Sequence, residues 1–256
     1  MNLTSFIVKK AAPVPRPETF EKYLFIGPHP DDIEIGAGAM IARLTSEGKQ
    51  VSFLICMDGR YGLEHAPEGI TPEELIRVRE AESLRSARVL GVTDVRFLRL
   101  SDGGFYDEKE LLEGMARVIG EIKPDILFAP DPDVDSECHP DHLNTAKAAK
   151  TLTFFAPFQN IMEKYGAEAA PVKAVAFYMT ARPNRFVRTG AFRDKQSEAI
   201  LCHKSQFPED SDAYAQVALY LKVRSLTFGL KSLKGNAEGF RVLGTTQMHC
   251  LPEAGI

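Results

Sequence analysis

Two short motifs place histidines and carboxylates at spacings suited to binding a metal ion. The first is His29-Pro-Asp-Asp32 and the second is His139-Pro-Asp-His142. Zinc accepts imidazole nitrogen and carboxylate oxygen, and a catalytic zinc site needs three protein ligands with one position open for water. His29 and Asp32 supply two such ligands, three residues apart across a turn. Either His139 or His142 can supply the third, while the other faces the substrate.

A buried strand is expected before each motif. Residues 23–28 and 125–130 are apolar runs of the kind found in strands that are covered on both faces of a parallel sheet. Asp31 and Asp32 are costly to place between such a strand and a helix unless a cation holds them. Each motif alone is equally typical of a helix cap. Because the carboxyl ends of parallel strands share one ligand-binding edge, the two motifs together predict a single metal site.

The alternation of apolar runs with helical patterns predicts an α/β, three-layer Rossmann-like fold with a mainly parallel sheet. Strands are expected at 23–28, 51–57, 95–100, 125–130 and 172–179, and helices at 34–47, 72–90, 108–122, 140–155, 194–203 and 212–226. Thr71 and Pro72 suit the start of the second helix, and Gly91 suits its end. The tail is expected to be irregular. We expect residues 1–20 to form an extended arm and residues 21–256 a single domain.

Composition excludes several classes of function. The chain has 256 residues, a formal net charge of −4 and a pI of about 5.9, which argues against a nucleic-acid partner. No run of about 20 apolar residues is present, so we expect no membrane partner and a cytoplasmic location. Four cysteines, Cys56, Cys138, Cys202 and Cys250, lie far apart and favour reduced thiols over disulfides.

The residues around the two motifs resemble the PIG-L/LmbE-like zinc-dependent N-deacetylases. The resemblance is carried by residues 27–38, GPHPDDIEIGAG, together with His139-Pro-Asp-His142. It extends to the segments Arg79-Glu-Ala-Glu82, Leu98-Arg-Leu-Ser-Asp-Gly103 and His203-Lys-Ser-Gln206, and so covers residues 23 to 206.

The resemblance implies a role for each residue of the motifs. It implies that His29, Asp32 and His142 bind zinc. Asp31 then acts as the general base, and His139 stabilises the transition state. In its protonated form, His139 gives the developing oxyanion a second positive partner besides the metal. Iron, cobalt or manganese is also compatible with two nitrogens and one carboxylate. The resemblance is compatible with a homo-oligomer.

Other residues have two interpretations each. The resemblance gives Arg79 a contact with the substrate, whereas its spacing from Glu82 is typical of a surface ion pair. Asp102 is expected either to bind substrate or to support a residue that does. His203 is either a core histidine or a substrate contact. Cys138 is expected to pack rather than to bind the metal, and His65 and His249 receive no role.

The predicted function is hydrolysis of the N-acetyl group of a small substrate that contains N-acetylglucosamine. One alternative is an amidase acting on a thiol conjugate. Another, from a different class, is a catalytically silent metal- or sugar-binding module, although Asp31 and His139 beside the ligands argue against it. A redox enzyme is disfavoured because Gly36-Ala-Gly38 lacks the third glycine of a dinucleotide fingerprint. These glycines are expected to let the first helix pack closely on the sheet.

Overall fold

The computed structural model describes residues 10–208 and 211–249. Its centre is a seven-stranded sheet of order β3-β2-β1-β4-β5-β7-β6. The strands are β1 (Lys22–Gly27), β2 (Gln50–Met57), β3 (Asp94–Leu100), β4 (Ile126–Pro130), β5 (Ala174–Tyr178), β6 (Arg185–Arg188) and β7 (Ala237–Gly244). β1 to β5 are parallel, and β7 runs antiparallel to β5 and β6. The expected mainly parallel α/β sheet is confirmed.

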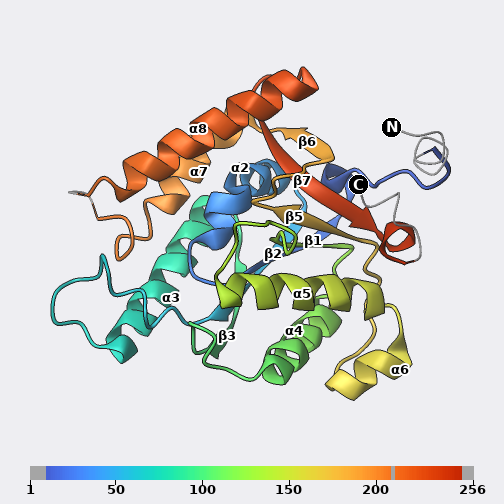
Figure 1. The fold of residues 1–256 in the computed structure, drawn as a ribbon, viewed down its shortest axis with the longest axis horizontal. Coiled ribbons are helices and arrows are strands. Elements are labelled where there is room, and N and C mark those ends of the chain that lie inside the picture. Colours follow the sequence, from blue (N-terminus) through green and yellow to red (C-terminus); the bar gives the residue numbers. More distant parts are fainter. Residues whose placement is uncertain (1–9, 209–210, 250–256) are drawn as a thin grey trace.

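Helices cover both faces of the sheet (Figure 1). They are α2 (Asp32–Ser46), α3 (Pro72–Val89), α4 (Glu108–Ile122), α5 (Pro140–Phe155), α6 (Gln159–Met162), α7 (Arg193–Ile200) and α8 (Ala213–Ser232). Helices α2, α3 and α7 lie together on one face, and α4 and α5 pack side by side on the other (Figure 1). Among the described residues, none of these helices is long and apolar enough to cross a membrane.

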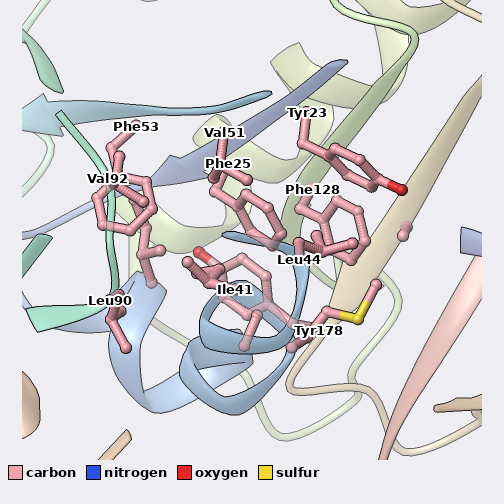
Figure 2. Close-up of a cluster of buried hydrophobic side chains, with 14 of the residues drawn as sticks. Tyr23, Phe25, Ile41, Leu44, Val51, Phe53, Leu90, Val92, Phe128 and Tyr178 are labelled. Carbon is pink, nitrogen blue, oxygen red and sulfur yellow. The ribbon is translucent and has the colours of Figure 1, made fainter. Parts of the chain in front are cut away.

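The alternation of side chains along β1 builds a core on each face of the sheet. Tyr23 and Phe25 point into the cluster under α2, where Ile41 and Leu44 of that helix meet them (Figure 2). The intervening residues, Leu24 and Ile26, point into the cluster under α4 and α5. Strand β1 is therefore buried on both faces, as its continuous apolar run predicts.

Local signals at the ends of α3 act as expected. The hydroxyl of Thr71 accepts a hydrogen bond from the backbone N–H of Glu74, and the Glu74 carboxylate accepts one from the N–H of Thr71. This capping box satisfies two backbone donors at the helix start. Gly91 follows the helix with a φ of 80°. Gly36 of α2 lies directly against the ring of Tyr178, where a Cβ would not fit, so close packing on the sheet is its role.

The prediction of an irregular tail is wrong. Strand β7 lies inside the sheet between β5 and β6, and six of its eight residues from Gly239 onward are buried without a break. The strand contains two charged residues, Glu238 and Arg241, and two glycines. It therefore lacks the continuous apolar run by which the other buried strands were predicted. Strand β6 was not expected either, and α8 runs six residues past the expected end at Leu226.

The N-terminal arm is only partly extended. Pro17–Thr19 form a short 3-10 turn, and Pro17 is buried. The arm is held by the body of the chain, since Arg185 Nε donates to the carbonyl of Pro15 at 3.0 Å and Gln247 Nε2 donates to that of Ala12 at 2.7 Å. Residues 1–9 of the expected arm lie outside the described residues.

A buried ion pair joins β7 to the loop after β4. Arg241 Nε lies 2.9 Å from Asp131 Oδ2, and the two side chains are 7% and 2% exposed. Burial works against ionisation, but Arg241 outweighs it and lowers the pKa of Asp131 below its usual value. The ion pair therefore stabilises the folded protein at neutral pH, and this contribution is lost as the pH falls through the pKa of Asp131.

Substituting Asp131→Ala should destabilise the protein by about 3 kcal/mol, because the Arg241 charge then lacks its buried partner. For a chain of this length, the melting temperature should fall by roughly 6–12 °C. Asp133→Ala is the matched control, since Asp133 also contacts Arg241, at 2.8 Å, but is 49% exposed. Calorimetry that gives equal shifts for the two variants would contradict this assignment.

Candidate active site

The structure brings the two motifs to one edge of the sheet. Strands β1 and β4 are neighbours, and the first motif follows β1 while the second leads into α5. The imidazole rings of His29, His139 and His142 have centroids 4.8 to 5.4 Å apart. The two motifs therefore form one cluster at the carboxyl ends of the strands.

Three of these side chains can hold a metal ion. Oδ2 of Asp32 lies 3.3 Å from Nδ1 of His29 and 3.4 Å from Nε2 of His142, and the three ligand atoms lie within 4.8 Å of one another. Two imidazole nitrogens and one carboxylate oxygen fit a catalytic metal site that keeps a position open. A second combination, His29 with His139 and Asp141, is also close enough, but Asp141 is occupied by other donors.

The electrostatics of the cluster favour a bound cation. Burial works to raise the pKa of Asp32, but His142 and His29 outweigh it and hold that pKa well below its usual value. Burial likewise works to lower the pKa of His29, yet Asp141 and Asp32 raise it to about 10. The carboxylates thus attract positive charge strongly, whether as protons on the imidazoles or as a metal ion.

Asp141 holds His29 in place, and sequence reasoning missed it. Its side chain is fully buried, and Oδ2 lies 2.9 Å from Nε2 of His29. The carboxylate also accepts hydrogen bonds from the backbone N–H groups of Gly103, at 2.7 Å, and Gly104, at 2.8 Å. Because Nε2 faces Asp141, Nδ1 of His29 is free to face the metal-binding cluster, an arrangement common around protein metals. The signal available was the position of Asp141 between the two histidines of its motif.

Substituting Asp141→Asn should weaken metal binding by about 10- to 100-fold. The amide lacks the negative charge that orients His29, and its NH2 group would face donors where the carboxylate accepted. A titration of zinc against a chromogenic chelator measures the change. Asp135→Asn is the control, because the Asp135 carboxylate lies in the loop before α5 and is 93% exposed. An unchanged dissociation constant in folded Asp141→Asn would remove this role.

Glu137 is a second carboxylate that the sequence did not indicate. Its Oε2 lies 3.2 Å from Nδ1 of His142, and its Oε1 accepts a hydrogen bond of 2.8 Å from the backbone N–H of His139. His29 and His142 each have one ring nitrogen close to Asp32. The other ring nitrogen lies close to a second carboxylate, which is Asp141 for His29 and Glu137 for His142.

Asp31 sits beside the cluster in an unusual backbone conformation. Its φ is 112°, a value rare for residues other than glycine and common at functional sites. Its side chain makes no capping hydrogen bond to α2, whereas His139 caps α5 by accepting the N–H of Asp141. The helix-cap interpretation therefore holds for the second motif and not for the first. Burial raises the pKa of Asp31 to about 6, against the opposing charge of Arg79. A carboxylate with a pKa in this range suits general base catalysis near neutral pH.

Arg79 supports the loop that carries Asp31. It is buried and donates to the carbonyl of Pro30 at 2.8 Å and to that of Gly59 at 3.1 Å, and its Nη2 lies 3.3 Å from Oδ2 of Asp31. Of the two interpretations of Arg79, the surface ion pair with Glu82 is wrong. Arg79 lines the pocket, and its contact with the substrate stays a prediction. Glu82 is also buried and accepts hydrogen bonds from Ser205 instead.

Asp102 and His139 both line the pocket above the cluster. The Asp102 carboxylate accepts the backbone N–H of Tyr61 at 3.2 Å. Nδ1 of His139 accepts the backbone N–H of Asp141 at 3.3 Å, which leaves Nε2 to carry the proton. Burial and the charge of His29 lower the pKa of His139. A neutral, donating imidazole therefore replaces the protonated one that we expected.

The remaining histidines and cysteines lie outside the pocket. His203 is fully buried, with Nε2 3.2 Å from Oε1 of Glu34, which favours the core interpretation. His65 is exposed, and His249 stacks on Phe154. Cys138 is exposed, so the packing role expected for it is wrong, while Cys56 is buried and Cys202 partly so, and all three are free thiols. Cys250 lies outside the described residues.

An open pocket of about 280 Å³ lies over the metal-binding cluster. It is lined by His29, Asp31, Tyr61, Gly62, Arg79, Asp102, Gly103, His139 and Gln206. Apart from the two glycines and the aromatic Tyr61, every lining side chain is polar or charged. A larger hollow of about 650 Å³ beside Arg43 and Phe192 contains no such cluster. The chemistry therefore places the candidate active site at the smaller pocket.

The chain therefore combines a mainly parallel α/β sheet with a potential metal site at the carboxyl ends of its strands, and comparison with known proteins identifies the family. The family model described as PIG-L, GlcNAc-PI de-N-acetylase, matches residues 24–153. The chain belongs to the PIG-L family.

Individual relatives share most of the chain. A diacetylchitobiose deacetylase of Thermococcus kodakarensis is 33% identical over 92% of this chain and 88% of its own length. A 1D-myo-inositol 2-acetamido-2-deoxy-alpha-D-glucopyranoside deacetylase of Kineococcus radiotolerans is 28% identical over 65% of this chain and 54% of its own length. The solved N,N'-diacetylchitobiose deacetylase of Pyrococcus horikoshii, in complex with its inhibitor, superposes with a TM-score of 0.87. It is 28% identical and covers 98% of this chain and 97% of its own.

Proposed function

We propose that this protein is a zinc-dependent N-deacetylase that releases acetate from a small sugar containing N-acetylglucosamine. The observation that carries the proposal is the juxtaposition of Asp31 with the cluster of His29, Asp32 and His142. Membership of the PIG-L family supports it, as do relatives named as deacetylases of acetamido sugars.

His29, Asp32 and His142 would hold the metal through Nδ1, Oδ2 and Nε2, because these atoms converge. When bound, zinc supplies Lewis acidity that polarises the amide carbonyl and makes water acidic enough to react near neutral pH. Asp141 keeps the imidazole ring of His29 oriented for this task through its hydrogen bond to Nε2, and the Glu137 carboxylate lies beside Nδ1 of His142.

Asp31 provides the proton transfers of the reaction. Its carboxylate accepts the proton of the attacking water and delivers it to the nitrogen of the departing amine. Arg79 holds the carboxylate and the preceding carbonyl of Pro30 in place. We assign Nε2 of His139 to donate a hydrogen bond to the carbonyl oxygen, where negative charge develops.

The two alternatives have less support. An amidase for larger acyl groups on thiol conjugates would need apolar surface for the acyl chain, whereas the lining contains no aliphatic side chain. A silent binding module gives no reason for a carboxylate with a pKa near 6 beside the metal ligands.

A substrate panel tests the proposed function. The zinc-loaded protein is incubated with N-acetylglucosamine, N,N'-diacetylchitobiose and an N-acylated thiol conjugate, and released acetate and primary amine are measured. We expect equal amounts of acetate and amine from at least one of the sugars. Release from the thiol conjugate alone would favour the amidase, and no release from any compound would overturn the proposal.

A further inference from the structure

Helix α2, which begins at the first metal-binding motif, is interrupted after its first turn. Ala37 has a φ of −151° and a ψ of 15°, which lie outside the helical region, whereas the residues on either side of it are helical. The interruption separates residues 32–36 from the rest of the helix. This short segment carries the proposed metal ligand Asp32 and directly follows the proposed base Asp31, so its orientation matters for the site.

A buried glutamine of α7, the helix beside α2 (Figure 1), reaches into the interruption. Nε2 of Gln196 donates to the carbonyl of Glu34 at 3.0 Å and to that of Ile35 at 3.2 Å, and Gln196 is 5% exposed. In a continuous helix these two carbonyls would accept from the backbone N–H groups four residues further on. A side chain inserted into that hydrogen-bond ladder is a known cause of a sharp bend. Gln196 therefore supplies donors at the point where the helix is interrupted.

The glycine at position 38 makes room for this glutamine. A Cβ on Gly38 would lie 2.9 Å from Cγ of Gln196, which is too close for two carbon atoms that are not bonded. Gly36 has a different neighbour, the ring of Tyr178. The two glycines that resemble part of a dinucleotide fingerprint thus allow close packing on either side of the interruption.

The side chain of Glu238, from β7, lies near the same interruption. Burial raises the pKa of Glu238 to about 8, while the backbone N–H groups of Met40 and Ala39 act to lower it. These N–H groups belong to the first turn after the interruption, where a helical segment lacks internal partners for its donors. An amide donor thus lies beside the carbonyls that precede the interruption, and an acid group lies beside the N–H groups that follow it.

A hydrogen bond within the first turn extends the restraint to the catalytic loop. The backbone N–H of Ile35 donates to the carbonyl of Asp31 at 3.1 Å, while the carbonyl of Ile35 accepts from Gln196. A shift of residues 32–36 would therefore move Asp31 and Asp32 relative to the two histidine ligands. Misplacement of a catalytic group by about 1 Å can cost on the order of 10²-fold in rate.

We propose that Gln196 is a positioning residue, which fixes how the first turn of α2 presents Asp31 and Asp32 to the metal and the substrate. This inference rests on the proposed deacetylase function and adds a residue that neither metal-binding motif contains. Gln196 does not line the pocket over the cluster, so it acts through the backbone of α2 and not by contact with the substrate.

Gln196→Met tests this role, because methionine keeps the length of the side chain but has no N–H to donate. The zinc Kd, measured against a chromogenic chelator, should rise about tenfold. With zinc saturating, kcat for acetate release from N,N'-diacetylchitobiose should fall by about 10- to 100-fold. Gly38→Ala should cause losses in the same direction, because the added Cβ displaces Gln196, and it decides the question if Gln196→Met does not fold.

Gln247→Met is the matched control. Gln247 is likewise buried, at 7% exposed, and its Nε2 likewise donates to a backbone carbonyl, that of Ala12 at 2.7 Å. It holds the N-terminal arm rather than α2. Both methionine variants should lower the melting temperature, but Gln247→Met should leave the zinc Kd and kcat unchanged.

The outcomes separate this inference from the proposed function. An unchanged zinc Kd and kcat in folded Gln196→Met, or equal losses in Gln247→Met, would overturn the positioning role and leave the deacetylase in place. If the unaltered protein releases no acetate, the proposed function fails, while the zinc Kd of the variants still shows whether Gln196 positions the metal ligands.

Discussion

Substituting Asp31→Asn should reduce kcat for deacetylation by about 10² to 10⁴-fold while metal binding persists. The amide keeps the shape of the side chain and an oxygen that Arg79 can still contact, but it cannot accept a proton at neutral pH. The backbone strain at a φ of 112° is tolerated by Asn as well as by Asp. The variant should therefore fold, bind its metal and fail at the chemical step.

Two measurements check this result together. Acetate release gives kcat, and elemental analysis gives the metal bound per chain. Asp135→Asn is the control for loss of a carboxylate near α5, and its activity should match that of the unaltered protein. Asp31→Asn that retains full activity would remove the role of general base. Asp31→Asn that loses its metal would assign the residue to the metal site instead.

Asp32→Ala should abolish activity by a different route. Asp32 Oδ2 lies between His29 and His142 and also accepts the backbone N–H of His29 at 2.9 Å. Its removal takes away the anionic ligand and leaves two imidazoles to hold the metal alone. We expect a fall in activity on the order of 10³-fold or more, because the Lewis acid is lost with its several kcal/mol of transition-state stabilisation.

Metal content distinguishes the two variants. Asp32→Ala should lose metal on passage through a desalting column, whereas Asp31→Asn should retain it. Thermal melting shows whether Asp32→Ala is folded, and excess zinc should restore part of its activity by mass action. Folded Asp32→Ala that binds one equivalent of metal as tightly as the unaltered protein would exclude Asp32 as a ligand.

Much of the fold follows from local pattern. The strands before the two motifs are continuous apolar runs because parallel strands are covered on both faces, and the ends of α3 carry their own capping residues. Strand β7 does not follow from pattern. Its Arg241 is acceptable in the sheet only because Asp131, 110 residues away along the chain, neutralises it. A prediction that considers only neighbouring residues in the sequence cannot identify so distant a partner.

Part of the candidate site also follows from local sequence pattern, and part of it does not. The sequence places His29, Asp32 and His142 at one sheet edge because each lies directly after a strand or at the start of a helix. Asp141 and Glu137 were not predicted as site residues. Their role depends on which ring nitrogen of a neighbouring histidine faces them, and the sequence does not give side-chain orientation. The spacing of Arg79 from Glu82 was equally compatible with a surface ion pair, but the tertiary fold buries both side chains, and a contact of Arg79 with the substrate stays a prediction.

The most direct test of a metal-dependent deacetylase is a zinc titration of the chelated protein, with acetate release from N,N'-diacetylchitobiose as the readout. Chelation should abolish activity. Added zinc should then restore it in proportion, up to one equivalent per chain and no further, because His29, Asp32 and His142 form one site. Undiminished acetate release after the metal has been removed would contradict the account.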